Sequence, residues 1–238
     1  MSDTAECPKG YRFPKFVISH AVYLYHHFLL SYRDVQELLF ERGIDVSYET
    51  VRAWCARFGP DRAQALKQRR PRRGQVWHLD EMRVVVRGVV RWLWRAVNEH
   101  GDVLDVLLQE HRDTGAAKRF FHRLIDEQEL PERIVTDGLR SYGAALRELP
   151  ELDASEHITV SAAERQNNLI EQSHRPTREQ ERQQRSFRAV RRVQRFLFTH
   201  AEVGNLFRST RSGIPARLRR NNLARSFKSW GELSLSVP

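Results

Sequence analysis

The chain has 238 residues, of which 40 are Lys or Arg and 30 are Asp or Glu, so its formal net charge at pH 7 is +10. This length accommodates a medium-sized catalytic domain and a smaller partner domain, and the positive charge favours polyanionic partners such as nucleic acid. The two cysteines, Cys7 and Cys55, are far apart and have no ligand-spaced neighbours, which excludes a disulfide framework and a zinc knuckle. No apolar run could span a bilayer and no signal peptide is recognisable, so we expect a soluble, cytoplasmic, nucleoid-associated protein without a membrane partner.

The first patterned region, residues 16–58, predicts a helix-turn-helix domain. Apolar residues recur at helical spacing before and after Gly43, which suits a turn, and Ser47, which suits a helix N-cap. The second helix of such a domain presents side chains to a DNA groove. The candidates for this contact are Tyr48, Arg52 and Arg57. The alternative is a helical bundle whose polar face is only solvated.

Composition divides the rest of the chain. Residues 1–15 form a short N-terminal tail, and residues 59–75 are polar and basic without periodicity, which predicts a linker that either contacts DNA or is a mere tether. Residues 76–200 are expected to form the catalytic domain and residues 201–238 a basic C-terminal tail. Beyond Arg175 the basic residues greatly outnumber the acidic ones, which favours contacts with several phosphates over a solvated face.

Short apolar and β-branched runs in the central region predict three antiparallel strands, a helix, a fourth strand, a short helix and a fifth strand, followed by a long helical region. The strands are expected at 76–86, 89–98, 103–109, 131–136 and 157–160, and the helices at 114–128 and 142–149. This is the element order of the ribonuclease-H-like fold of retroviral integrases. We therefore expect an α/β, ribonuclease-H-like catalytic domain preceded by an all-α helix-turn-helix domain.

Three carboxylates fall where that fold carries its metal site. Asp80 lies on the first strand, Asp137 follows the fourth, and Glu171 lies in a late helix-prone stretch. Two-metal cleavage of a phosphodiester needs hard oxygen ligands of this kind, because Mg²⁺ or Mn²⁺ activates the attacking oxygen and neutralises the leaving one. We expect these residues to be both catalytic and metal-binding, with two Mg²⁺ or Mn²⁺ ions.

Other interpretations stay open at this point. An Asp at the end of a strand is more often a turn or cap residue than a ligand. Glu81, next to the first carboxylate, points to the opposite face of a regular strand and is interpreted as structural, although a local bulge would exchange it with Asp80. The rival third carboxylates are Glu164, Glu179 and Glu181.

Basic residues surround the third carboxylate. His174, Arg175 and Arg178 follow Glu171 at spacings that place them on one side of a continuous helix, where they could hold substrate phosphates. Pro176 predicts a kink or a break there, because proline removes a backbone donor. For His174, plain solvation is an equally good interpretation.

Several segments together resemble the insertion-sequence transposases of the DDE type, specifically insertion-sequence family six. These segments are Ser31–Val35, Ser47–Trp54, Trp77–Glu81, Trp92–Val97, Thr136–Ala144, Asn167–Asn168 and Glu171–Arg178. The resemblance implies that Asp80, Asp137 and Glu171 form the catalytic triad and that Arg178 fills a basic position that contacts DNA. It also implies action at short terminal inverted repeats and replicative joining of donor and target.

We therefore predict a transposase that binds terminal inverted repeats and catalyses metal-dependent DNA cleavage and strand transfer. Its partners would be the double-stranded DNA of the element ends and of the target, and further copies of the chain in a homodimer or larger synaptic complex. A catalytically inactive helix-turn-helix DNA-binding protein is one alternative and would bind without cutting. A structure-selective nuclease of the same fold is another and would cut without joining.

Overall fold

The computed structural model describes residues 7–28, 30–69, 74–160, 178–179, 189–208 and 215–236. The chain divides into two compact units. A helical unit combines residues 1–70 with residues 198–238, and a catalytic unit comprises residues 71–197. No helix in the described part of the chain is long and apolar enough to cross a membrane.

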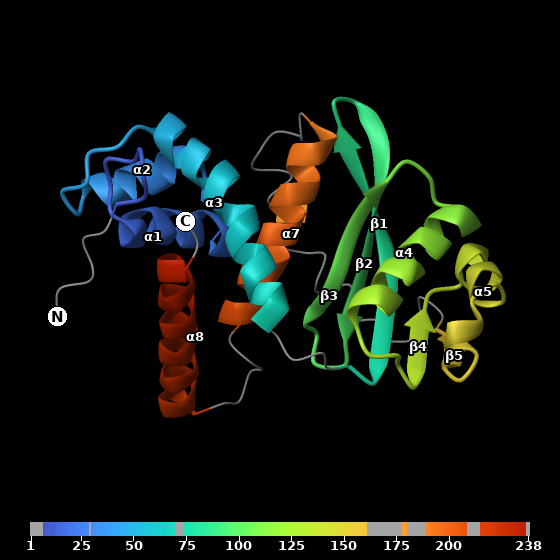
Figure 1. Cartoon of the computed structure of the whole chain (residues 1–238). Helices are drawn as coiled ribbons and strands as arrows, with labels where there is room; N and C mark the ends of the chain where they lie inside the picture. The colour runs from blue at the N-terminus through green and yellow to red at the C-terminus, as the bar shows by residue number, and fades with distance from the viewer. Residues whose placement is uncertain are drawn as a thin grey trace. The chain divides into compact units, whose positions relative to one another are not determined.

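The helical unit contains the predicted helix-turn-helix. Ser31 and Asp34 form a capping box at the start of the helix Tyr32–Phe40, and Gly43 takes a φ of 75° in the turn that follows, a conformation in which a Cβ atom is strained. The Tyr48 backbone N–H donates to the Gln36 side chain at 2.9 Å, which ties the turn to the preceding helix. The helices of this unit are α1 (Lys15–His27), α2 (Tyr32–Phe40), α3 (Tyr48–Arg69), the part of α7 (Val190–Phe207) from Phe198 onwards, and α8 (Ala216–Ser236) (Figure 1).

The structure differs from the expected linker of residues 59–75, because α3 continues through Pro60 as far as Arg69. Proline inside a helix removes one backbone hydrogen bond. The residues that follow it nevertheless bury side chains against the rest of the unit, with Ala63 fully buried and Leu66 nearly so. This burial offsets the loss at Pro60, and local composition did not reveal it.

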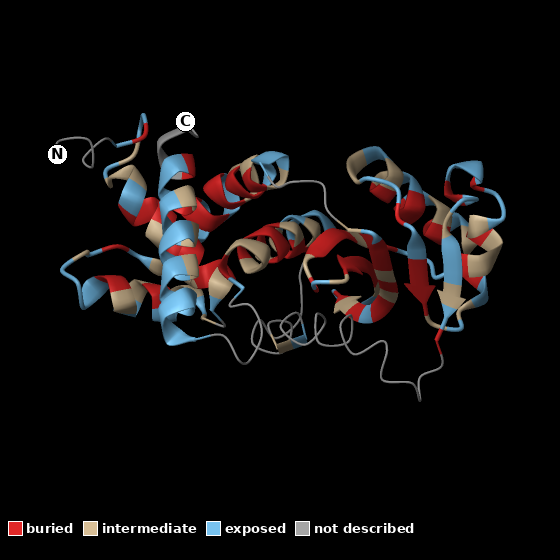
Figure 2. Cartoon of the chain, turned by 90° about the horizontal axis from the view of Figure 1, so that it is seen from below, coloured by how far each residue is buried: buried red, intermediate tan, exposed pale blue. Residues whose placement is uncertain are grey.

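The expected C-terminal tail of residues 201–238 also differs, since α8 is a helix of the helical unit. Its second half is anchored through Trp230, which is buried. The Trp230 indole N–H donates to the Ser19 carbonyl at 3.3 Å, and the Arg62 guanidinium lies 5.7 Å from the centroid of the Trp230 ring. The first half of α8 is exposed (Figure 2). The anchoring contacts join segments distant in sequence, so composition could not predict them.

The catalytic unit is built on a five-stranded sheet of order β3-β2-β1-β4-β5. The first three strands pair antiparallel, whereas β4 pairs in parallel with both β1 and β5. The strands are β1 (Val76–Val86), β2 (Val89–Asn98), β3 (Val103–Gln109), β4 (Arg133–Thr136) and β5 (Glu156–Thr159). This strand order, with these directions, is that of the ribonuclease-H-like fold, so the predicted fold class is confirmed.

Two helices, α4 (Thr114–Glu127) and α5 (Arg140–Leu146), cover one face of this sheet (Figure 1). Trp77 and Leu79 of β1 pack into the core beneath them, together with Phe120 of α4. These two β1 positions alternate along the strand, so odd-numbered β1 side chains face the helices and even-numbered ones face the other way. A short 3₁₀ helix, Pro150–Leu152, precedes β5.

A side chain from α7 (Val190–Phe207) hydrogen-bonds to the edge strand β3. The amide of Gln194 accepts from the Leu108 backbone N–H and donates to the Val106 carbonyl, both at 2.8 Å. Unpaired backbone groups at a sheet edge invite pairing with another chain. Gln194 satisfies one donor and one acceptor there.

Candidate active site

Parallel pairing of β1 with β4 brings the first two predicted carboxylates together. His78 lies opposite Val135 in this ladder, so two residues further on Asp80 comes opposite Asp137, just beyond the end of β4. The Leu139 backbone N–H donates to Asp137 Oδ1 at 3.0 Å and fixes this side chain at the entry to α5. Both carboxylates are partly exposed, so both can reach a solvent-borne ligand.

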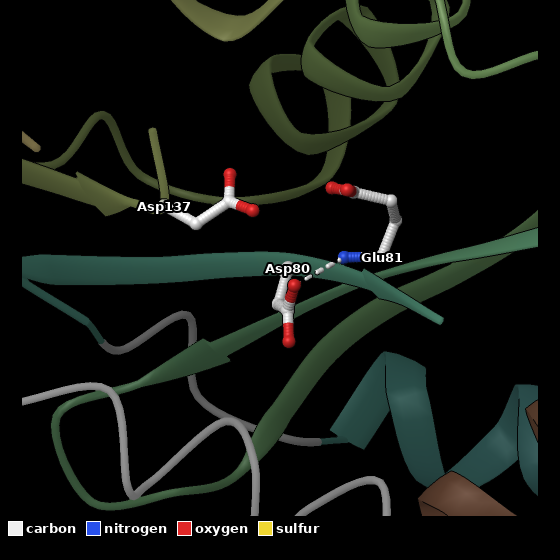
Figure 3. A group of neighbouring side chains, drawn as sticks. All are labelled: Asp80, Glu81 and Asp137. Atoms are coloured by element: carbon white, nitrogen blue, oxygen red, sulfur yellow. Dashed lines mark hydrogen bonds between the residues drawn. The ribbon is translucent and has the colours of Figure 1, made fainter. Parts of the chain in front are cut away.

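A third carboxylate, Glu81, joins them from the neighbouring position on β1. One oxygen each of Asp80, Glu81 and Asp137 lies within 4.8 Å of the other two. Strand alternation separates the neighbours, because Glu81 and Asp137 approach each other on one side of β1 while Asp80 turns to the other (Figure 3). The Glu81 backbone N–H also donates to Asp80 Oδ1 at 2.8 Å.

The oxygens of Glu81 are already occupied by side-chain donors. Tyr142 Oη donates to Glu81 Oε2 at 2.7 Å, and the Nε and Nη2 atoms of Arg112 both contact Glu81 Oε1. The Arg112 guanidinium continues to Asp137, with Nη2 3.5 Å from Oδ2, and lies 5.1 Å from the ring centroid of Trp92. Both oxygens of Glu81 therefore have side-chain partners within the protein.

Burial is the main influence on the protonation of Glu81. Burial raises the pKa of Glu81 to about 7, and the nearby carboxylates Asp137 and Asp80 act in the same direction. The hydrogen bond from Tyr142 and the charge of Arg112 oppose that shift. The pKa of Tyr142 is raised well above its usual value, first by burial and then by the Glu81 charge. The phenol therefore stays protonated and remains a hydrogen-bond donor.

The residues present fit a divalent metal. Carboxylate oxygens are the hard donors that Mg²⁺ and Mn²⁺ prefer. Like charges at this separation repel one another, and a divalent cation held by Asp80 and Asp137 would offset that repulsion. Glu171, the expected third ligand, lies outside the described residues, as do His174 and Arg175.

Of the three basic residues predicted to hold substrate phosphates, His174, Arg175 and Arg178, only Arg178 lies within the described part of the chain. Its Nε lies 3.2 Å from the Met82 sulfur. Met82 is two residues beyond Asp80 on β1, and side chains at this spacing share a face of a strand. Arg178 therefore lies over the same face of the sheet as Asp80.

The predicted DNA-reading side chains lie at the start of α3. Arg52 and Arg57 are exposed and Tyr48 is partly so. Arg52 pairs with Glu49 at 2.5 Å, Arg57 pairs with Asp61, and the Arg33 guanidinium lies 4.6 Å from the centroid of the Tyr48 ring. The helical unit thus presents two arginines and an aromatic ring at this surface.

Arg112 and Tyr142 are the residues of this cluster that sequence reasoning missed. They meet Glu81 from 31 and 61 residues away along the chain. The only signal was general, because a carboxylate at an inward position of a buried strand requires donors from somewhere. No local sequence pattern identifies the residues that supply those donors.

A mixed sheet of this order, with carboxylates paired across its two central parallel strands, defines the class of the protein as a polynucleotidyl transferase of ribonuclease-H-like fold. Enzymes of this class act on DNA or RNA phosphodiesters with divalent metal.

Comparison with known proteins gives the particular family. Residues 74–210 match the model of a family described as the DDE domain. The chain is 34% identical over 164 residues to the transposase for insertion sequence-like element IS431mec of Staphylococcus aureus, covering 69% of this chain and 73% of that protein. It is 33% identical, with the same coverage, to the transposase for insertion sequence element IS257 in transposon Tn4003 from Staphylococcus aureus.

Solved structures give looser likenesses. The catalytic core domain of BIV integrase superposes with a TM-score of 0.41 and 14% identity, covering 66% of this chain and 98% of that chain. The catalytic domain of Mos1 mariner transposase superposes with a TM-score of 0.41 and 13% identity, covering 75% and 91%.

The chain belongs to the DDE-domain family of insertion-sequence transposases. It is therefore a DNA-binding, DDE-type polynucleotidyl transferase that uses divalent metal, and the predicted enzyme class is confirmed.

Proposed function

We propose that Asp80, Asp137 and Glu171 are the catalytic triad and hold two Mg²⁺ or Mn²⁺ ions while the protein cuts and joins DNA at the terminal inverted repeats of a mobile element. The observation that carries the proposal is that carboxylate oxygens of Asp80 and Asp137 lie within 4.8 Å of each other, just beyond the parallel β1–β4 ladder. Relatives named for insertion sequence elements support the assignment of the substrate.

The chemistry needs two transfers at one site. A water oxygen attacks the phosphodiester at the element end, the bond to the 3′ oxygen breaks, and a 3′-hydroxyl and a 5′-phosphate result. That 3′-hydroxyl then attacks a phosphodiester of the target, so one bond forms as another breaks and no high-energy cofactor is consumed. Bound divalent metal supplies activation of the attacking oxygen and neutralisation of the leaving one.

The surfaces of both units suit this substrate. Arg178 lies on the Asp80 face of the sheet through its contact with Met82, and we assign it, with His174 and Arg175, to the DNA held at the site. Tyr48, Arg52 and Arg57 at the start of α3 are assigned to recognition of the inverted repeat. Transposition joins two ends, so we expect a homodimer or larger synaptic complex.

The experiment that tests the proposal incubates purified protein with a labelled element end, a target plasmid and Mg²⁺, and measures joined product. Glu171→Gln should abolish both cutting and joining. The matched control is Glu179→Gln, because Glu179 is a nearby carboxylate that was a rival third ligand.

Each outcome discriminates between functions. Joined product that disappears with Glu171→Gln and persists with Glu179→Gln supports the triad. Loss with Glu179→Gln instead moves the third ligand to that residue. Cutting without joining indicates a nuclease, and specific binding without either indicates an inactive DNA-binding protein.

A further inference from the structure

The acidic cluster contains a cation of its own. The Arg112 guanidinium bridges two carboxylates, contacting Glu81 through Nε and Nη2 and lying 3.5 Å from Asp137 through Nη2. Arg112 precedes α4 in the loop after β3, so it reaches the cluster from outside β1 and β4.

The guanidinium is held in one orientation from several sides. Glu81 receives it with a side chain that is fully buried, and Tyr142 Oη donates to the other Glu81 oxygen at 2.7 Å. The ring of Trp92 lies 5.1 Å from the guanidinium carbon. A planar guanidinium that directs two donors to one oxygen and packs near an indole has little freedom to rotate. The direction in which it faces Asp137 is therefore set by Glu81.

Asp137 is held at its other oxygen by the backbone. The Leu139 N–H donates to Oδ1 at 3.0 Å, and Arg112 faces Oδ2. These two interactions define the plane of a carboxylate that follows a short strand and is otherwise partly exposed. Residues that orient a metal ligand in this way typically change metal affinity by roughly 10-fold to 100-fold when they are altered.

We propose that Arg112 is a positioning residue of the transposition reaction, anchored on Glu81 and Tyr142, and that it orients the Asp137 carboxylate for metal binding. This inference rests on the proposed function, because it takes Asp137 to be a metal ligand. The residues that orient Asp137 in this proposal come from β1 (Glu81), the β3–α4 loop (Arg112) and α5 (Tyr142).

The test is a Mn²⁺ titration of the full-length protein without DNA, in which electron paramagnetic resonance counts the free ion. The first variant is Arg112→Lys, which keeps the positive charge and removes the planar fork, so electrostatics stay nearly constant. We expect Mn²⁺ binding to weaken by roughly tenfold. Strand transfer should recover towards the wild-type rate at saturating Mn²⁺, a split that general damage to the fold does not produce.

The matched control is Arg123→Lys. Arg123 donates to a second fully buried carboxylate, Asp105, at 2.7 and 3.1 Å. Asp105 lies on β3, which β2 separates from β1, so this variant loosens an equivalent pair in the same unit without touching the cluster. Its Mn²⁺ affinity should equal that of the wild type.

A second variant keeps the proposal testable if Arg112→Lys does not fold. Tyr142→Phe removes one hydroxyl and no charged side chain, and it loosens the anchor of Glu81. We expect a smaller, few-fold loss of Mn²⁺ affinity. Circular dichroism verifies the fold of each variant.

Two results overturn the inference while leaving the proposed function intact. In the first, Asp137→Asn abolishes Mn²⁺ binding, but Arg112→Lys binds Mn²⁺ as tightly as the wild type or more tightly. The other is an equal loss in Arg123→Lys. If Asp137→Asn itself binds Mn²⁺ normally, the failure belongs to the proposed site.

Discussion

Asp80 and Asp137 stand opposite each other although 56 residues separate them in the chain, because β1 and β4 pair in parallel from Val76 opposite Arg133 onwards. Their negative charges repel each other. The two charges that are proposed to bind metal therefore also lower the stability of the metal-free protein.

Asp80→Asn should raise stability while abolishing strand transfer. Removing the Asp80 charge, which lies within 4.8 Å of the Asp137 and Glu81 oxygens, relieves repulsion on the order of 1 kcal/mol for partly solvated groups. Thermal denaturation in EDTA should show a higher melting temperature than the wild type. Adding Mn²⁺ should narrow the difference, and an unchanged melting temperature in EDTA would contradict the idea that the charges repel.

Arg52→Gln and Arg57→Gln should weaken binding to the element end. An arginine that reads a base edge contributes about 1–3 kcal/mol of discrimination, whereas one on a phosphate weakens all sequences alike when it is replaced. Competition binding with cognate and scrambled ends separates the two roles. Retention of full affinity for the cognate end by both variants would remove the start of α3 from the recognition surface.

The exposed first half of α8 should contribute to DNA affinity without sequence preference. Basic residues dominate it, and Arg217, Arg219, Arg220 and Arg225 are all exposed. Replacing Arg219 and Arg220 with Gln should lower the slope of log affinity against log salt by about 0.9 for each phosphate that the variant no longer neutralises. A slope equal to that of the wild type would mean that this face is only solvated.

Gln194→Ala should loosen the edge of the sheet. The substitution leaves the Leu108 N–H and the Val106 carbonyl without the partners they have at 2.8 Å, and removing each hydrogen bond costs roughly 1 kcal/mol. Hydrogen exchange at β3 should accelerate while exchange in β1 stays slow. Equal protection of β3 in both proteins would show that Gln194 is dispensable.

The helical unit should lose stability in mild acid through His26. Burial, followed by the charge of His200, lowers the pKa of His26 to about 3, below its ordinary 6.5. The unfolded state therefore binds the extra proton first, so the free energy of unfolding falls as the pH drops from about 6.5 towards 3, by roughly 1.4 kcal/mol per pH unit. Exchange of α1 amides between pH 7 and pH 5 measures it, corrected for the intrinsic rate, and His26→Gln should flatten the dependence.

Much of this protein could be predicted from local pattern. The alternation of apolar residues defined the first three strands to the residue, the stripe through Phe120 and Phe121 defined α4, and element order alone led to the fold and to Asp80 and Asp137. These features depend on periodicity over a few residues, which the sequence states directly.

Tertiary packing decided the rest. The extension of α3 past Pro60 follows from burial of its inner face, and the anchoring of α8 follows from Trp230 meeting Ser19 and Arg62. The support of the site depends on Arg112 and Tyr142 reaching Glu81 across the sheet and its helices. A buried carboxylate requires donors, but only the folded arrangement of β1, α5 and the β3–α4 loop selects which ones it finds.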